Sequence, residues 1–273
     1  MPDQFSLTPL DQHWVVIDDD VRLSNYWDLE PLCRGPEPRP DWVVTDRAAV
    51  DEELGVLKTG KEADVFLLER AGADGATVMA AKRYRGEDHR DFQRSSAYAE
   101  GRRVRSSRDT RAMAKKTAYG RAVAAGQWAN AEWESLKRLW LIGVPVPYPV
   151  QIDGTEILME LVLDPDTGDP APRLARQRPT PALLASWFEQ LREAMLVMAS
   201  QQIAHGDLSP YNVLAAGERL VVIDLPQVVD LVANPAASEF LMRDCHNVCT
   251  WFAARGLEVS EDDLFGEVLA AAW

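Results

Sequence analysis

Residues His205–Leu214, HGDLSPYNVL, and Leu220–Gln227, LVVIDLPQ, hold the most informative pattern in this 273-residue chain. Asp207 and Asn212 are five residues apart, and Asp224 follows twelve residues after Asn212. A single aspartate in such a segment is usually a helix cap or part of an Asx turn. Two aspartates and an asparagine around one hairpin, directly after an amphipathic helix, instead indicate a site that carries out chemistry.

The spacing His-x-Asp-x-x-x-x-Asn is typical of the catalytic loop of protein kinases, and a second aspartate follows on the next hairpin. Phosphoryl transfer needs one carboxylate that orients the attacking hydroxyl and accepts its proton. It also needs hard oxygen ligands for Mg²⁺ beside the phosphates. Asp207 suits the first role, and Asn212 and Asp224 suit the second.

Helices are expected before and after this segment. Apolar residues at helical spacing mark a long amphipathic helix that ends near Ile203: Leu184, Trp187, Leu191, Met195 and Met198. Two short strands are expected within 211–227, and the chain from about Ala236 is expected to be helical. Ser260, with Asp263 three residues later, predicts a capping box before the last helix.

The preceding part of the chain is expected to be rich in strands. Residues 63–70 and 77–84 have strand character and are joined by AGADGA, which favours a hairpin. Lys82 ends the second strand, where an inward-facing lysine needs an acidic partner. It fits the strand lysine that contacts nucleotide phosphates, and the expected partner in the following helix is Glu132, with Glu134 as the alternative.

Residues Gly55–Leu68, GVLKTGKEADVFLL, contain G-x-x-x-x-G-K, which is close to the phosphate-binding P-loop. A P-loop joins a strand to a helix, and the hydroxyl of its Ser or Thr binds Mg²⁺. Here Glu62 stands at that position and the sequence continues into a strand. We therefore expect a loop between two strands that covers a nucleotide, although only Gly60 and Val65 match the kinase pattern G-x-G-x-x-G-x-V.

These elements predict an α+β, bilobal, protein-kinase-like fold with a strand-rich N-lobe and a helical C-lobe around a cleft. The expected parts are an N-terminal extension at 1–50 that packs on the kinase, an N-lobe at 51–162 and a C-lobe at 163–273. A helix is expected at 128–143, and the proline-rich loop 164–181 is the expected crossing between the lobes.

The sequence after the second aspartate is short and contains no A-P-E element. A conventional protein kinase uses that region for its activation segment and peptide-binding platform. We therefore expect a truncated form of the fold, which does not hold its substrate as an ordinary kinase holds a peptide.

The composition is that of an ordinary globular protein, with 47% hydrophobic and 26% charged residues. A net charge of −14 argues against a nucleic-acid footprint over the whole surface. Three cysteines make no disulfide framework and fit a reducing cytoplasm, which is the localisation we expect. No secretory signal and no membrane-spanning run is expected.

Two further features have competing interpretations. Residues 83–126 carry a net positive charge although the whole chain is acidic, because this segment contains ten arginines and two lysines but only five acidic residues. With little apolar periodicity, this segment is expected to be a flexible basic insert in the N-lobe. Cys245, His246 and Cys249 suggest a metal site, but their apolar neighbours at helical spacing favour core packing.

Six motifs resemble those of the RIO family of atypical serine/threonine protein kinases: TGKEADVF, GVPVPYPV, ILMELV, HGDLSPYNVL, VIDLPQ and EFLMRDCHNV. The similarity covers about residues 50–260, and the I-D-x-x-Q that ends at Gln227 is its most specific motif. The chain is most similar to the subfamily without an N-terminal winged helix, in a bacterial-type form. The nucleotide loop of that subfamily reads S-T-G-K-E-A, so Lys58 here replaces a serine.

The resemblance implies ATP and Mg²⁺ as cofactors, with Mn²⁺ as the alternative metal, and a set of nucleotide-binding residues: Lys61, Glu62, Lys82, Glu132, Met159, Glu160 and Val162. Lys82 would bind the phosphates with Glu132 as its pair. Met159 would be the gatekeeper, and Glu160 and Val162 would offer hinge backbone groups to adenine.

The same resemblance implies that Asp207 is the catalytic base and that Asn212 and Asp224 hold the metal. In similar proteins the aspartate at the Asp224 position can itself accept phosphate, so Asp224 has two candidate roles. The basic insert would carry the autophosphorylated residue, and its charge would also suit RNA in a ribosomal particle. Its candidate acceptors are Ser95, Ser96, Ser106, Ser107 and Thr110. A solvated loop explains the insert equally well.

Three functions remain open from the sequence. The first is an atypical serine/threonine kinase that acts on a protein or on itself. The second is an ATPase whose phosphate cycle on Asp224 switches its binding to a partner. The third is a small-molecule phosphotransferase of the aminoglycoside-kinase type, because HGDLSPYNVL resembles that family's loop as well. Gln227 and the G-K-E loop favour RIO over the third.

Overall fold

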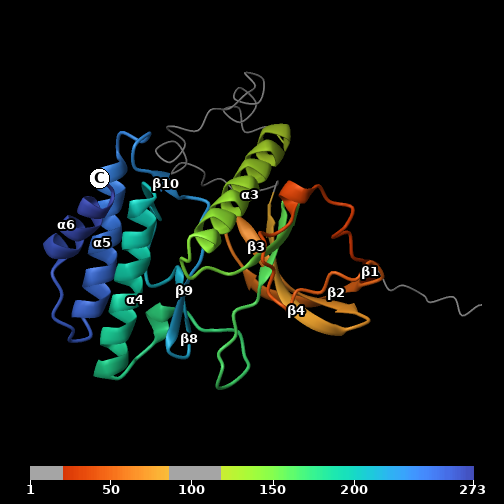
Figure 1. The fold of residues 1–273 in the computed structure, drawn as a ribbon, viewed down its shortest axis with the longest axis horizontal. Coiled ribbons are helices and arrows are strands. Elements are labelled where there is room, and N and C mark those ends of the chain that lie inside the picture. The colour runs from red at the N-terminus through yellow and green to blue at the C-terminus, as the bar shows by residue number, and fades with distance from the viewer. Residues whose placement is uncertain (1–20, 86–117) are drawn as a thin grey trace, which may run out of the picture.

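The computed structural model describes residues 21–85 and 118–273. The strand-rich half forms a six-stranded antiparallel sheet in the order β1-β2-β3-β4-β6-β5, and the helices α4, α5 and α6 gather on the other side of the molecule (Figure 1). The strands span Val21–Leu23 (β1), Val50–Thr59 (β2), Ala63–Gly72 (β3), Gly75–Tyr84 (β4), Pro149–Asp153 (β5) and Glu156–Glu160 (β6). The predicted two-lobe α+β arrangement is confirmed.

The register of β2, β3 and β4 decides which side chains face the cleft. Val65 on β3 lies opposite Lys58 on one side and opposite Lys82 on the other. Directly opposite residues of an antiparallel pair project to the same face of the sheet. Lys58 and Lys82 therefore extend from one face, two strands apart.

Helix α3, Ala118–Leu141, begins ten residues before the predicted 128–143. The early turns have no stripe of large apolar residues, because their sequence AYGRAVAAGQ is mostly small or polar, so periodicity could not reveal them. Both ends of the basic segment 83–126 thus belong to regular elements, β4 and α3. Residues 86–117, with the five candidate phosphoacceptors, lie outside the described residues.

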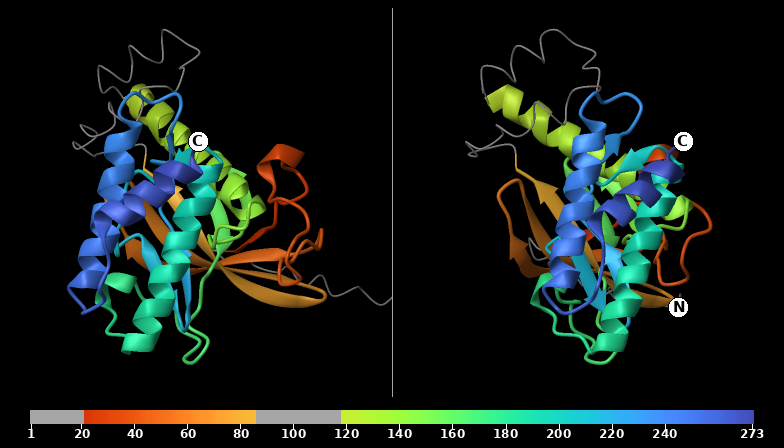
Figure 2. Two further views of the ribbon diagram at one scale, coloured as in Figure 1. Left: turned by 60° about the vertical axis from the view of Figure 1, so that its left-hand side comes forward. Right: turned by 90° about the vertical axis from the view of Figure 1, so that its left-hand side faces the viewer.

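The C-lobe is built from three helices and short strands: α4 (Pro181–Ser200), α5 (Ala237–Ala253), α6 (Glu261–Ala271), β7 (Ile203–Ala204), β8 (Val213–Ala216), β9 (Arg219–Val222) and β10 (Val229–Asp230). Figure 2 shows α4, α5 and α6 lying side by side. Side-chain oxygens of Thr180 and Ser260 accept backbone N–H groups at the starts of α4 and α6. In the described parts of the chain, no helix is both apolar and long enough to span a membrane.

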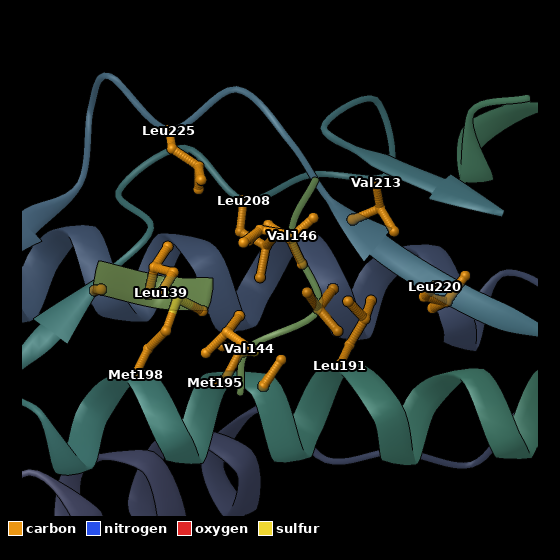
Figure 3. Close-up of a cluster of buried hydrophobic side chains, with 14 of the residues drawn as sticks. Leu139, Val144, Val146, Leu191, Met195, Met198, Leu208, Val213, Leu220 and Leu225 are labelled. Atoms are coloured by element: carbon orange, nitrogen blue, oxygen red, sulfur yellow. The ribbon is translucent and has the colours of Figure 1, made fainter. Parts of the chain in front are cut away.

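The core of the C-lobe fixes the segment 205–227, which carries the two aspartates and the asparagine of the kinase pattern. Each of Asp207, Asn212 and Asp224 is followed by an aliphatic residue that is at most 1% exposed: Leu208, Val213 and Leu225. In Figure 3 these three side chains point into the cluster above α4 that also contains Leu191, Met195 and Met198. Burial of one such side chain contributes about 1.5–3 kcal/mol, so the three polar neighbours are held in place by the core.

Residues 24–49 pack on the sheet face opposite to Lys82. Tyr26 is buried against Met79 and Tyr148, and Met79 alternates with Ala80 and Lys82 along β4. The same segment includes the short 3₁₀ helix Pro31–Cys33, whose Leu32 carbonyl accepts hydrogen bonds from Trp133 and Lys137 of α3, each at 3.1 Å. It therefore contacts the helix that carries Glu132.

A buried ion pair joins β2 and β3. Arg70 lies opposite Asp51, and its Nε and Nη2 donate to the two carboxylate oxygens at 2.6 and 2.8 Å, with both side chains fully buried. Asp51→Leu leaves the guanidinium buried and unpaired, so the free energy of unfolding should fall by about 3–5 kcal/mol in urea denaturation.

The matched double variant Asp51→Leu/Arg70→Met removes both charges and should recover most of that loss. Arg22→Met is the surface control, because the Arg22–Glu156 pair is half-exposed on the arginine side and should be worth less than about 1 kcal/mol. A double variant as unstable as the single variant would contradict the buried-charge explanation.

Candidate active site

A cavity of about 630 Å³ lies between the sheet and the C-lobe, within the usual size range of small-molecule sites. Eight of the predicted site residues line it: Lys61, Glu62, Lys82, Glu132, Met159, Glu160, Val162 and Asp224. Asp207 and Asn212 do not line the cavity; they lie in the loop next to Asp224. Predicted site residues that lie far apart in the sequence, from Lys61 to Asp224, therefore line one cavity.

Lys82 bridges two carboxylates at one end of this cavity. Its Nζ lies 2.7 Å from Glu132 Oε1 and 2.9 Å from Asp224 Oδ1. Glu132 is only 2% exposed and also accepts from Tyr84 Oη at 2.5 Å, whereas Glu134 is exposed and pairs with Lys137. Glu132 is therefore the partner that the buried strand lysine requires.

Lys82 and Asp224 each favour the charged form of the other. Burial alone would lower the pKa of Lys82, but the carboxylates of Asp224 and Glu132 outweigh it and hold that pKa well above its ordinary value. The positive charge of Lys82 in turn lowers the pKa of Asp224, against the effect of burial. Asp224 also has a φ of +68°, a backbone conformation that is uncommon outside glycine and gathers at functional sites.

The loop over the cavity joins β2 to β3, as predicted, and no helix follows it. Its turn is tight, because the Gly60 N–H donates to the Ala63 carbonyl at 3.0 Å, and a Cβ at Gly60 would lie only 2.7 Å from that oxygen. The side chains of Lys61 and Glu62 are exposed and border the cavity. The strand–loop–strand context excludes a P-loop.

We call His205–Asp224 the catalytic segment, after the role that its sequence predicts. It is stabilised by bonds within itself. Asn212 Nδ2 donates to the Asp207 carbonyl at 2.9 Å, and the Ile223 N–H donates to the Asn212 carbonyl at 2.9 Å. The buried His205 ring accepts the Asp207 N–H at 3.3 Å and lies 3.1 Å from the Ile223 carbonyl. Asp207, Asn212 and the residue before Asp224 are therefore tied into one network.

Helix α5 supplies a residue that the sequence analysis missed, Asp244. Its carboxylate accepts the N–H groups of Gly206 and Leu208, both at 2.8 Å, on either side of Asp207. Asn247 from the next turn donates to the Leu208 carbonyl at 2.9 Å. Burial raises the pKa of Asp244 to about 6. The sequence signal that could have found Asp244 is an acidic residue on the apolar face of the helix 237–253.

Position 206 of this loop cannot accept a side chain larger than that of glycine. Its φ is +82°, and a Cβ there would lie 2.6 Å from the Gln227 carbonyl. The H-G-D and I-D-x-x-Q motifs are therefore in direct backbone contact.

Two arginines in the predicted inter-lobe loop were also missed, Arg173 and Arg176. Both line the cavity, next to the short 3₁₀ helix Leu174–Arg176. Their neighbours are prolines and other loop residues, so no periodicity distinguishes them from solvated charges.

The strand that carries Met159 leads into the crossing between the lobes. The Glu160 N–H donates to the Tyr148 carbonyl and the Val162 carbonyl accepts from Ala171, both at 2.9 Å. Among the backbone hydrogen bonds described, none uses the Val162 N–H. This edge of the cavity therefore offers backbone groups to a planar ring.

Cys245 and Cys249 lie in the core, and burial raises their pKa values to about 12 and about 11. Such thiols are poor metal ligands, because a ligating thiolate must form first. Within the described residues, no three His, Cys, Asp or Glu side chains gather as a metal site. An Asp–Asn pair that shares Mg²⁺ with nucleotide phosphates needs no such cluster.

Comparison with known proteins gives a consistent assignment. A family model described as "RIO domain" matches residues 67–264. The RIO-type serine/threonine-protein kinase Rio1 of Haloferax volcanii is 38% identical over 216 residues, which cover 79% of this chain and 68% of that protein. The serine/threonine-protein kinase RIO1 of Chaetomium thermophilum is 27% identical, but the match covers 80% of this chain and only 43% of that protein.

A solved structure shares the fold. The Rio2 kinase–ADP/Mg²⁺–phosphoaspartate complex from Chaetomium thermophilum aligns with a TM-score of 0.54 and 22% identity, covering 80% of this chain and 65% of that one. The kinase-like bilobal fold is thereby confirmed. The family model spans most of the chain, so this protein belongs to the RIO family of serine/threonine-protein kinases.

Proposed function

We propose that this chain is an ATP- and Mg²⁺-dependent serine/threonine kinase, which phosphorylates a protein hydroxyl, its own included. The observation that carries the proposal is the contact of Lys82 with both Glu132 and Asp224 at one end of a nucleotide-sized cavity, beside the Asp207–Asn212 loop. Phosphoryl transfer depends mainly on positioning and electrostatic stabilisation, and this arrangement provides both.

The residues present fit ATP and Mg²⁺. The Val162 N–H and the Glu160 carbonyl would hold adenine beside Met159, and Lys82 would contact the α- and β-phosphates, with Lys61 and Glu62 near them. The Asn212 amide oxygen and the Asp224 carboxylate are hard oxygen ligands of the kind that Mg²⁺ prefers. Bound Mg²⁺ would neutralise charge on the phosphates during transfer.

Asp207 is the proposed base. It orients the acceptor hydroxyl and takes its proton while the hydroxyl oxygen bonds to the terminal phosphorus and the bond from that phosphorus to ADP breaks. Asp244 and His205 hold the backbone on either side of Asp207, so its carboxylate is pre-positioned. Arg243 Nη2 lies 4.0 Å from Asp207 Oδ1, at the limit of an ion pair.

A second candidate function is an ATPase switch that passes through an aspartyl phosphate at Asp224. The Asp224 carboxylate borders the cavity in a left-handed backbone conformation, and Lys82 keeps it ionised and therefore nucleophilic. Its oxygen would bond to the terminal phosphorus as ADP leaves, and water would then cleave the acyl phosphate. The related Rio2 complex is described as containing a phosphoaspartate, which supports this alternative.

The physiological partner is proposed only by class. A protein hydroxyl is the expected acceptor, and Ser95, Ser96, Ser106, Ser107 and Thr110 remain the candidates for self-phosphorylation. Contact of the basic segment with RNA or a ribosomal particle also remains a prediction, because most of that segment lies outside the described residues.

Incubation with γ-labelled ATP and Mg²⁺ separates these functions. A kinase should retain acid-stable label on serine or threonine, and both Asp207→Asn and Asp224→Asn should lose it. An ATPase switch should give acid-labile, hydroxylamine-sensitive label that Asp224→Asn abolishes, with release of free phosphate. Transfer only to added aminoglycosides would support a small-molecule phosphotransferase. The absence of both label and hydrolysis with any acceptor would refute the kinase and the ATPase switch.

A further inference from the structure

Lys58 extends the cationic surface of the cavity beyond Lys82. It shares a cross-strand row with Val65 and Lys82, and all three residues line the cavity. Unlike Lys82, Lys58 forms no ion pair with any carboxylate of the described residues. Its charge is therefore available to a ligand.

Arg173 and Arg176 bring two more cations to the opposite wall. Arg173 Nη1 donates to the carbonyl of Tyr211, and its backbone forms an isolated bridge with Leu214. Arg173 is therefore held by two residues of the catalytic segment, one before and one after Asn212. Neither Arg173 nor Arg176 forms an ion pair within the described residues, although the chain carries a net charge of −14.

The three side chains interact electrostatically across the cavity. Burial and then the charge of Arg173 lower the pKa of Lys58, and Asp224 opposes them. Burial likewise lowers the pKa of Arg173, again with Asp224 as the opposing charge. Like charges on two lobes that face one carboxylate repel one another, so an anion placed between them would be stabilised.

We propose that Lys58, Arg173 and Arg176 form a site for the terminal phosphate of a nucleoside triphosphate, which makes the protein prefer ATP over ADP. This inference rests on the proposed function, since it assumes that adenine lies near Met159 and that Lys82 contacts the inner phosphates. Lys58 and Arg173 both interact electrostatically with Asp224, toward which a third phosphate would extend, and Arg176 interacts with each of them. Arginine suits this role because its planar donors bind phosphate oxygens in pairs.

Isothermal titration calorimetry with Mg·ADP and with the non-hydrolysable Mg·adenosine 5′-(β,γ-imido)triphosphate tests the site. Wild type should bind the triphosphate more tightly. Arg173→Leu/Arg176→Leu should weaken triphosphate binding by roughly tenfold or more, the equivalent of one lost charge-assisted contact, and leave ADP affinity unchanged. Lys58→Ser, which restores the serine of the related loop motif, should act in the same direction.

Arg178→Leu is the matched control, because Arg178 is an exposed arginine of the same segment that does not line the cavity. It should change neither affinity. Arg176→Leu alone guards against misfolding, because Arg176 is exposed and makes no side-chain hydrogen bond among those described. Equal losses for ADP and triphosphate, or no loss in any variant, would overturn the inference. Failure of wild type to bind either nucleotide would instead refute the proposed function.

Discussion

Asp207→Asn should lower the rate of phosphoryl transfer by about 10²–10⁴-fold, the usual contribution of a general base. Affinity for Mg·ATP should stay near the wild-type value, because Asp207 does not line the cavity and forms no bond to Lys82. The amide retains the shape of the side chain and cannot accept a proton. Single-turnover transfer of label, combined with calorimetric nucleotide binding, measures the two effects separately.

Asp166→Asn is the control for removal of one negative charge, since Asp166 is exposed in the loop between β6 and α4. It should affect neither rate nor affinity. Asp207→Asn that kept a near-normal rate would rule out the base role. A variant that lost nucleotide affinity in parallel with rate would show instead that Asp207 shapes the nucleotide site.

The size of this effect depends on groups that hold Asp207 in place. Asp244 accepts the N–H groups of the residues before and after Asp207, and Leu208 is buried in the core cluster. A base fixed in this way needs little reorganisation before it meets the hydroxyl. The loop motif therefore contains the proposed base, and helix α5 behind it holds that base in place.

Much of the fold could be predicted because its signals are local. The β3–β4 hairpin, α4 and the β8–β9 hairpin follow from alternation, helical spacing and turn residues within short windows. The first turns of α3 could not be predicted, since small residues leave no periodic stripe. The two-residue strands β7 and β10 are also too short to produce a pattern.

The site divides in the same way. Asp207, Asn212 and Asp224 have a fixed spacing, and Lys82 stands out as a charge on an apolar strand. Asp244 and Arg173 have no such local signal, because their importance comes from tertiary contacts with the catalytic segment. The candidate reacting residues could therefore be named from the sequence, whereas those that hold them in place or add positive charge to the cavity could not.

Lys82→Met should impair both stability and activity, because it removes the cation shared by Glu132 and Asp224. Glu132 is nearly fully buried, so the free energy of unfolding should fall by about 3–5 kcal/mol when its carboxylate loses that partner. Nucleotide affinity and transfer rate should fall as well, since the inner phosphates lose their contact. Urea denaturation and calorimetric binding of Mg·ADP measure these losses.

A double variant separates the two effects. Lys82→Met/Glu132→Gln removes the buried charge, and the glutamine oxygen can still accept from the Leu225 N–H, while its NH₂ group can donate to Tyr84 Oη in place of the lost acceptor. It should recover a large part of the stability and none of the activity. Arg192→Met, which removes an exposed ion pair with Glu267, should cost less than about 1 kcal/mol. Recovery of activity in the double variant would show that Lys82 acts only by balancing Glu132.

The pH dependence follows from the two shifted groups. The pKa of Lys82 is raised, so its stabilisation is complete below about pH 10 and is lost only as pH rises through the folded-state pKa. The pKa of Asp224 is lowered, so its stabilisation is present above about pH 4 and is lost as pH falls through the folded-state pKa. The stability difference between wild type and Lys82→Met should therefore shrink as the pH falls, because protonation of the carboxylates beside Lys82 removes the charge that it balances. A difference that stays constant into strong acid would contradict this electrostatic origin.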